Sequence, residues 1–235
     1  LEMIIHWQRV GFVHGVMNTD NMSILGLTID FGPYGWLEGF DFGWTPNTTD
    51  SQYKRYRFGN QPNMGLWNLY QLANALYPII EEVEPLEAIL KQYTVAFEQQ
   101  SLVMMKSKLG FTTTAADDLQ LIQNLEDNLQ LVETDMTIFF RNLSDFTEAA
   151  YGLKLIENAF YDLEHISNEV KNKWNLWFEK YADRLQQETV SSEERKEKMD
   201  AVNPKYVLRN YMSQMAIDEA DKGNYALIDE LFTLL

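Results

Sequence analysis

The sequence has no cysteine at any of its 235 positions, which excludes a disulfide framework, a thiolate metal site and a cysteine nucleophile. Basic residues are few: 19 lysines and arginines face 35 acidic residues, which gives a net charge of −16. A chain this acidic has no general electrostatic attraction for nucleic acid or for an anionic membrane. The sequence also lacks an apolar run long enough to span a bilayer and an N-terminal secretion signal. We therefore expect neither a nucleic acid nor a membrane among the partners.

Hydrophobic residues make up 46% of the chain and aromatic residues 13%, enough to build a folded core. Glycine is concentrated early, with nine of the twelve glycines at or before Gly65. The acidic charge is concentrated late, because residues 1–60 carry only −2 of the total. These shifts predict short strands and shaped loops over residues 1–65, followed by helices over residues 66–235, together forming one continuous domain.

Helical spacing of apolar residues recurs along most of the chain. One short helix is expected to end at Gly11, and another to end at Pro78. Thr114 and Ser191 are expected to cap helices, and the aromatic residues between Trp174 and Tyr181 are expected to lie in the core. The predicted helices are 2–10, 66–77, 85–108, about 119–129, 134–143, 147–165, 168–188, 191–200, 204–222 and 225–234.

One stretch of the early region carries a pattern used in phosphoryl transfer. His14 and Asn21 have the same separation as the histidine and the metal-binding asparagine of the protein-kinase catalytic loop. Two short apolar segments, Met22–Leu25 and Leu27–Ile29, predict a small β-hairpin directly afterwards. Asp30-Phe31-Gly32 then follows, as the Asp-Phe-Gly motif does in kinases. The fold expected from this pattern is mainly α: a protein-kinase-like C-lobe with a short β-hairpin at the catalytic loop and additional C-terminal helices.

The residue types suit a magnesium site. Mg²⁺ on nucleotide phosphates takes hard oxygen ligands, commonly one or two carboxylates or an amide oxygen beside phosphate and water. A hairpin between Asn21 and Asp30 would return both side chains to one end, where they could meet one ion. His14 is more typical of a loop anchor than of a base.

The loop departs from the kinase pattern at one position. Val16 occupies the place of the catalytic aspartate, and an aliphatic side chain cannot accept a proton. Asp20 lies in the same loop, so either Asp20 has taken that role or the domain is inactive. A second Asp-Phe-Gly tripeptide begins at Asp41, but no apolar strand precedes it, and its context favours Asp30 as the functional copy.

The segments His14–Ser23 and Thr28–Gly35 resemble the selenoprotein-O (SelO) family of protein adenylyltransferases, which have a pseudokinase fold. Tyr53–Pro62 followed by Trp67–Leu69 is similar to the family segment after the metal-binding aspartate, and Asn203–Tyr211 is similar to its C-terminal signature. The resemblance is dense over residues 1–80 and again near 203–215.

The resemblance implies transfer of AMP from ATP to serine, threonine or tyrosine hydroxyls of protein substrates, with the nucleotide flipped relative to its orientation in kinases. It implies Asp20 as the proton acceptor, Asn21 and Asp30 as Mg²⁺ ligands, and Asp30 as a residue that also approaches ATP. The family's glycine-rich loop, phosphate-binding lysine and arginines precede this motif. We therefore expect the chain, which begins with leucine, to be the C-terminal part of such an enzyme, inactive alone, from a bacterial cytoplasm or a mitochondrion.

Two other functions remain open at this stage. A non-catalytic helical binding domain could keep a vestigial kinase loop, although a scaffold has no need of both Asn21 and Asp30. A kinase-like phosphotransferase, such as an aminoglycoside-type kinase, would need a base where Val16 stands. The basic and aromatic segment Tyr53–Arg57 is compatible equally with a solvated loop paired with local acids and with contact to an anionic ligand or substrate.

Overall fold

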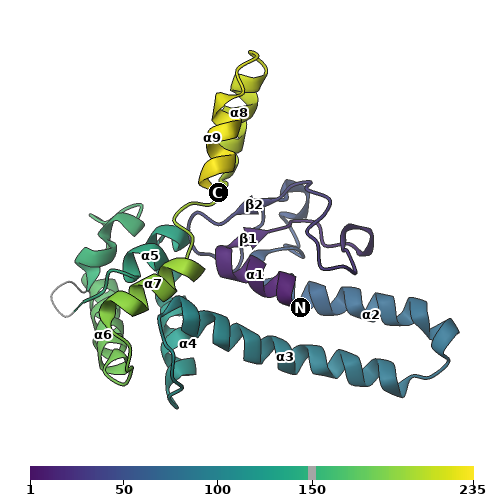
Figure 1. Ribbon diagram of the computed structural model, residues 1–235, viewed down its shortest axis with the longest axis horizontal. Coiled ribbons are helices and arrows are strands. Elements are labelled where there is room, and N and C mark those ends of the chain that lie inside the picture. The colour runs from purple at the N-terminus through teal and green to yellow at the C-terminus, as the bar shows by residue number, and fades with distance from the viewer. Residues whose placement is uncertain (148–151) are drawn as a thin grey trace. The chain divides into compact units, whose positions relative to one another are not determined.

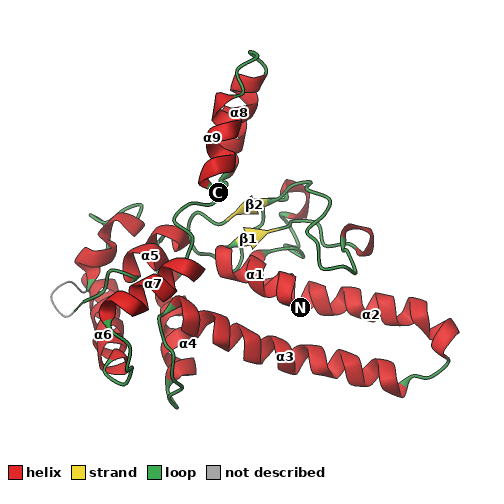
Figure 2. Ribbon diagram, in the orientation of Figure 1, coloured by secondary structure: helices red, strands yellow, loops and turns green. Residues whose placement is uncertain are grey.

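The computed structural model describes residues 1–147 and 152–235, and these residues are mainly helical (Figures 1 and 2). The strands are β1 (Phe12–Val13) and β2 (Gly35–Trp36), each two residues long. Short 3₁₀ helices cover Thr19–Asn21, Thr48–Asp50, Phe58–Asn60 and Leu153–Ala159. The α-helices are α1 (Glu2–Val10), α2 (Gln61–Ile80), α3 (Glu84–Lys108), α4 (Asp118–Leu129), α5 (Met136–Leu143), α6 (Asn168–Leu185), α7 (Ser192–Val202), α8 (Asn210–Ala220) and α9 (Ala226–Leu234). Within the described ranges, every helix is too short or too polar to cross a membrane.

The chain divides into two compact units. The first unit contains Leu1–Tyr34 and Asp41–Met105, and the second contains Gly35–Phe40 and Lys106–Leu235. The change of composition at residue 65 falls inside the first unit, and the division proposed there remains a prediction. All of the predicted motif residues, from His14 to Asp30, belong to the first unit.

The first unit is built on α1, α2 and most of α3. As predicted, α1 ends at Gly11, whose φ of 70° is in the left-handed region that glycine adopts without a steric penalty. In Figure 1, α3 runs back alongside α2 after the turn that joins them. The Tyr93 hydroxyl of α3 donates a 3.2 Å hydrogen bond to the carbonyl of Pro62 in α2. Gly65 makes room for this contact, because a Cβ there would lie 2.6 Å from the Tyr93 hydroxyl.

The second unit has an aromatic core centred on α6. Trp174, Trp177, Phe178 and Tyr181 are all at most 1% exposed, so their predicted core position is confirmed. The polar atom of Trp177 reaches a partner, since its Nε1 donates to the carbonyl of Leu121 at 3.0 Å. The N-terminal cap predicted for α7 is also present: Ser191 Oγ accepts the backbone N–H of Glu194 at 3.1 Å.

The predicted β-hairpin over Met22–Ile29 is absent. Gly26 does form a turn, with a φ of 71° and a 3.2 Å bond from its N–H to the carbonyl of Ser23. No strand ladder flanks this turn, however, and Ile24 at its tip is 82% exposed. The second segment is instead attached elsewhere in the unit, because the Thr28 hydroxyl and the Ile29 carbonyl bond to the side chains of Trp7 and His14.

Several helix boundaries also differ from prediction, and α2 begins at Gln61, five residues before the predicted start. Helix α2 continues through Pro78 to Ile80. Pro78 lacks the N–H that would bond to the carbonyl of Asn74, but only this one helical bond is lost near the end of the helix, and Asn74 is exposed to water. Thr114 does not cap α4, because this helix begins at Asp118 with Asp117 at the N-cap position; Thr114 Oγ1 accepts from Lys106 Nζ at 2.6 Å. Residues 204–209 precede α8 as a non-helical segment.

The helix predicted over residues 147–165 is wrong in its described part. The described part contains the 3₁₀ helix Leu153–Ala159, turns and extended residues, while residues 148–151 lie outside the described ranges. The left-handed φ of Gly152, 78°, is incompatible with a continuous right-handed helix. Apolar spacing alone therefore misassigned this segment.

Candidate functional site

His14 joins the two parts of the motif. The side chain is 1% exposed, and its Nε2 lies 2.8 Å from the carbonyl oxygen of Ile29, which directly precedes Asp30. Its Nδ1 accepts the backbone N–H of Val16 at 3.4 Å. Because a carbonyl oxygen only accepts hydrogen bonds, Nε2 must carry the ring hydrogen. Both nitrogens are engaged, so His14 is a structural anchor and has no free nitrogen to act as a base.

Trp7 in α1 provides a second attachment for the same segment. Its Nε1 donates a 2.9 Å hydrogen bond to Thr28 Oγ1, two residues before Asp30. The indole also stacks on the imidazole of His14, with ring centroids 5.5 Å apart and an interplanar angle of 29°. Helix α1 therefore fixes both the anchor and the segment that it anchors.

Asn21 lies at the end of the 3₁₀ helix Thr19–Asn21, with the exposed Asp20 beside it. The Asn21 side-chain Nδ2 donates to the carbonyl of Val16 at 3.0 Å. An amide held by its nitrogen still offers its Oδ1 as an acceptor, the atom that a hard cation would use. Asp20 and Asn21 thus share one turn, with one exposed aspartate and one hydrogen-bonded amide.

Three hydrogen bonds run in series between the predicted metal ligands. The Asn21 amide bonds to the carbonyl of Val16, the N–H of Val16 bonds to His14, and His14 bonds to the carbonyl of Ile29. The residue after Ile29 is Asp30. The structure therefore connects the Asn21 turn to the Asp30 segment through side chains instead of through the predicted strand pairing.

The backbone of Asp30 adopts an uncommon conformation. Its φ is 57°, in the left-handed region, where aspartate is among the better-tolerated residues apart from glycine. Tight backbone bonds follow, from Gly32 N–H to the Asp30 carbonyl at 2.8 Å and from Tyr34 N–H to the Gly32 carbonyl at 2.9 Å. Phe31 packs edge-on against Tyr34, with ring centroids 5.3 Å apart. Sparsely populated backbone conformations of this kind are enriched at functional sites.

Three buried side-chain amides hold the loop from outside. Gln61 donates from Nε2 to the carbonyl of Phe12 at 2.9 Å and accepts the N–H of His14 at 3.0 Å. Asn47 donates to the carbonyl of Gly15 at 3.1 Å, and Asn68 donates to the carbonyl of Met17 at 2.9 Å. Buried backbone groups without partners are costly, and these amides supply the partners.

Gly15 sits where the loop passes closest to its neighbours. Its φ is 81°, and a Cβ at this position would lie 2.2 Å from the carbonyl oxygen of Pro33. No side chain fits at that distance without moving backbone. The glycine that follows the histidine of the motif is therefore required by the close passage of residue 33.

The second Asp-Phe-Gly tripeptide has a different environment. Asp41 Oδ1 accepts the N–H of Gly43 at 2.6 Å, so the carboxylate is used within its own turn. Phe42 stacks on Phe58, with centroids 6.0 Å apart and an interplanar angle of 14°. This copy is a local turn packed on an aromatic ring, in keeping with the preference for Asp30.

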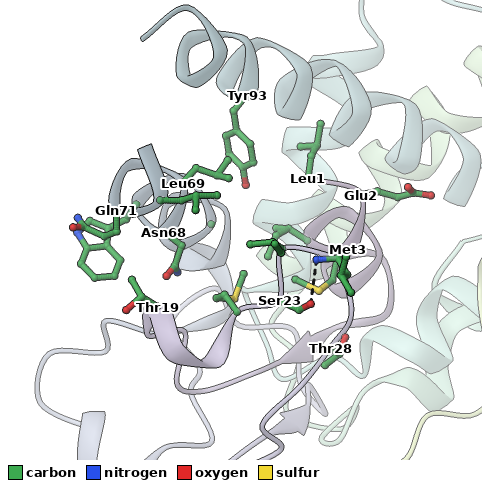
Figure 3. Close-up of a pocket in the computed structure, with 18 of the residues that line it drawn as sticks. Leu1, Glu2, Met3, Thr19, Ser23, Thr28, Asn68, Leu69, Gln71 and Tyr93 are labelled. Carbon is green, nitrogen blue, oxygen red and sulfur yellow. Dashed lines mark hydrogen bonds between the residues drawn. The ribbon is translucent and has the colours of Figure 1, made fainter. Parts of the chain in front are cut away.

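A cavity of about 990 Å³ lies in the first unit beside the motif. Figure 3 shows Tyr93 directed from α3 toward a space bounded by Asn68 and Leu69 of α2 and by the first residues of α1. Thr19 and Ser23 line the same space from the motif loop, whereas Asp20, Asn21 and Asp30 do not line it. The predicted catalytic and metal-binding residues therefore lie outside this cavity.

Within residues 1–147 and 152–235, no group of three or more histidine, aspartate and glutamate side chains is arranged to hold a metal ion. The predicted ligands Asn21 and Asp30 are a smaller set, one amide and one carboxylate. Mg²⁺ bound with a nucleotide commonly takes one or two protein oxygens and completes its shell with phosphate and water. The donor types of this pair fit such an ion.

Comparison with known proteins assigns the family. The family model described as protein adenylyltransferase SelO matches residues 1–235. Three curated proteins named protein nucleotidyltransferase YdiU are similar: one from Flavobacterium johnsoniae is 60% identical over 237 residues, one from Aromatoleum aromaticum 50% over 233, and one from Rhodopirellula baltica 47% over 248. The chain belongs to the SelO family, which confirms the resemblance found in the motif.

The matched region covers nearly all of this chain but less than half of each of the three relatives. The matches include 99–100% of this chain but only 44–46% of each of these three relatives. The chain thus spans less than half the length of the curated relatives that it matches.

The sequence pattern does not indicate the three buried side-chain amides that hold the loop. Gln61 and Asn68 lie in segments that carry the family resemblance, but no role was predicted for them, and Asn47 was not singled out. Their partners are 32 to 51 residues away, so no local spacing indicates the contacts. The sequence therefore carries no local signal for these three amides.

Proposed function

We propose that this chain is the C-terminal part of an ATP- and Mg²⁺-dependent protein adenylyltransferase that transfers AMP to serine, threonine or tyrosine hydroxyls. The observation that supports this most directly is the series of hydrogen bonds from Asn21 through Val16 and His14 to Ile29, next to Asp30. These bonds hold the Asn21 amide by its nitrogen, which leaves its oxygen available, and they hold the backbone next to Asp30. Family membership supplies the reaction class.

In the proposed reaction, Asp20 accepts the proton of the substrate hydroxyl, and the hydroxyl oxygen attacks the α-phosphorus of ATP. The bond between the α-phosphorus and the α,β-bridging oxygen breaks, and pyrophosphate leaves. Asp20 suits this role because it is exposed on the turn that also carries Asn21, so a protein substrate can reach it. Val16 offers no competing base.

Asn21 and Asp30 would hold the metal ion. Bound Mg²⁺ would neutralise charge on the triphosphate and on the leaving pyrophosphate. The left-handed backbone of Asp30 and the anchored Ile29 place the Asp30 backbone at this end of the loop. The predicted location, a bacterial cytoplasm or a mitochondrion, rests on the resemblance; the three compared relatives are bacterial.

The proposal is tested on the full-length enzyme with ATP labelled at either the α- or the γ-phosphate. We expect α-label, and no γ-label, to become attached to protein in the presence of Mg²⁺. Mass spectrometry of the labelled protein should show an adenylyl group on a hydroxyl side chain. Incorporation of γ-label would instead identify a kinase-like phosphotransferase, and absence of both labels would favour a non-catalytic domain.

A further inference from the structure

The segment Tyr53–Arg57, here called the basic loop, concentrates positive charge in an acidic protein. Tyr53 is 80% exposed, and Lys54 and Arg55 are also exposed. In the described part of the chain, neither Lys54 nor Arg55 forms an ion pair with a carboxylate. The side chains of Lys54 and Arg55 are therefore not paired with local acids, as the first of the two interpretations left open by the sequence would require.

Arg55 is held by aromatic rings. Its guanidinium carbon lies 4.7 Å from the ring centroid of Trp67 and 5.6 Å from that of Tyr56. Cation–π contacts of this kind orient a guanidinium while leaving its N–H groups available as donors. Arg55 is thus an oriented, exposed donor group without an acidic partner in the described ranges.

The backbone of the basic loop is fixed in place. The Asp50 carboxylate accepts the N–H of Arg55 at 3.0 Å and the N–H of Tyr56 at 2.8 Å, and it is therefore occupied with backbone. Asn60 Nδ2 donates to the carbonyl of Arg55 at 2.6 Å. Lys54 has a φ of 48°, an uncommon conformation for lysine that such bonds must maintain. The backbone at Arg55 and Tyr56 is therefore held by side chains on both sides of it.

The basic loop is also attached to the proposed catalytic turn. The Tyr56 hydroxyl donates a hydrogen bond to Asn18 Oδ1, and Asn18 lies two residues before Asp20. The residue next to Tyr56 is Arg55. The basic loop is thus attached to the turn that carries Asp20, the proposed proton acceptor for the substrate hydroxyl.

We propose that Lys54 and Arg55 bind acidic side chains of the protein substrate beside the target hydroxyl. This inference rests on the proposed function and adds a substrate class to it: hydroxyl residues in acidic segments. A chain of net charge −16 repels an acidic segment in general, so recognition of one requires a local cationic site. Arg55 offers paired N–H groups that match a carboxylate.

The test uses the full-length enzyme and two fluorescein-labelled peptides, each with one threonine. Glutamates flank the threonine in the first peptide and glutamines in the second. We expect the wild-type enzyme to show a lower KM for the glutamate peptide with α-labelled ATP. Arg55→Gln should raise that KM about threefold to tenfold and leave kcat, the KM for ATP and the KM for the glutamine peptide unchanged. Lys54→Gln should act in the same direction.

Two further variants separate charge from structure. Arg55→Lys keeps the positive charge and should retain part of the preference for the glutamate peptide. Lys91→Gln is the matched control, because Lys91 is an exposed lysine of α3 that pairs with Glu87 at 3.6 Å, and it should change nothing. A raised KM for ATP in Arg55→Gln, or equal losses with both peptides, would overturn the inference.

Fluorescence anisotropy of the two peptides tests the inference apart from the reaction. Tighter binding of the glutamate peptide by wild-type enzyme, lost in Arg55→Gln, supports the acidic-substrate site even if γ-label is incorporated in place of α-label. Equal binding of both peptides to the wild-type enzyme overturns it even if AMP transfer is confirmed. The two proposals can therefore fail separately.

Discussion

His14 and Asn21 show how single polar side chains organise the candidate site. Each makes a hydrogen bond whose direction follows from simple chemistry: the carbonyl of Ile29 requires a donor at His14 Nε2, and the carbonyl of Val16 requires the nitrogen of Asn21. The groups left over are the Asn21 oxygen and the carboxylates of Asp20 and Asp30. At the scale of the residue, the proposed function gives these two carboxylates different roles.

Replacing Asp20 and replacing Asp30 in the full-length enzyme should have different effects on nucleotide binding and on turnover. Asp30→Ala removes a charged metal ligand, so both binding of Mg²⁺–ATP and turnover should collapse. Asp20→Ala should leave nucleotide binding intact and slow transfer by about 10²- to 10⁴-fold, the usual contribution of a general base. Calorimetric titration with Mg²⁺–ATP and incorporation of α-label measure the two effects.

Asp20→Asn is the matched control, since it keeps the shape of the side chain and removes the proton acceptor. It should lose activity as Asp20→Ala does. Full activity in either variant would mean that Asp20 is only a turn residue and that the proton acceptor lies elsewhere in the enzyme.

The site residues could be selected from the sequence because the types and spacing of a metal-binding motif are local information. His14, Asn21 and Asp30 lie within 17 positions of one another. Their mutual support could not be predicted, since Trp7 and Gln61 are drawn from helices outside the motif. Spacing predicts which residues carry the chemistry, whereas distant side chains decide how they are held.

At the scale of the element, the segment Met22–Ile29 shows why a short apolar pattern is ambiguous. Two apolar runs around Gly26 predict a hairpin, but hairpins of this length have little stability of their own. Here Thr28 and Ile29 bond to Trp7 and His14, and the ladder does not form. Long helices such as α3 and α6 were predicted well because their apolar spacing extends over several turns.

The cap of α7 provides a direct test at this scale. Ser191→Ala removes the oxygen that accepts the N–H of Glu194, and we expect a loss of about 1 kcal/mol in the free energy of unfolding. Ser192→Ala, one position inside the helix, is the matched control and should change stability by less. Urea unfolding followed by circular dichroism measures both, and equal effects of the two substitutions would contradict the capping role.

At the scale of the whole molecule, a buried carboxylate of this acidic chain needs hydrogen-bond donors around it. In the second unit, the Glu188 carboxylate accepts hydrogen bonds from Thr112 and Thr113 and from Arg184 Nη1 at 2.7 Å. Burial alone would raise the pKa of Glu188, but these donors outweigh burial and lower its pKa to about 2. The charged form is therefore the one that the fold stabilises.

Stability should consequently decrease in acid. The pKa of Glu188 is lower in the folded chain than the ordinary value of 4.5, so its contribution is fully present above that pH and is lost as the pH falls through about 2. Glu188→Gln should weaken the decrease in stability between about pH 5 and pH 3. Urea midpoints measured across this range for both proteins provide the test, and parallel pH profiles would contradict the assignment.

The 235-residue chain on its own should bind ATP poorly. Asn21 and Asp30 supply two metal ligands, but a triphosphate is normally held by several basic side chains and backbone N–H groups as well. A net charge of −16 adds a general repulsion for a polyanion. Since the curated relatives are more than twice as long, the missing donors are expected in the part of those proteins that this chain does not match.

Calorimetric titration of the isolated chain with Mg²⁺–ATP should therefore show affinity weaker than micromolar, and the full-length enzyme measured in parallel should bind more tightly. Asp30→Ala in the isolated chain is the control, because any weak binding that passes through the predicted metal site must disappear with this carboxylate. Micromolar binding by the isolated chain that Asp30→Ala abolishes would show that the two ligands and the groups around them are sufficient. In that event the phosphate-binding residues would have to be sought within this chain, beginning with Lys54 and Arg55 of the basic loop.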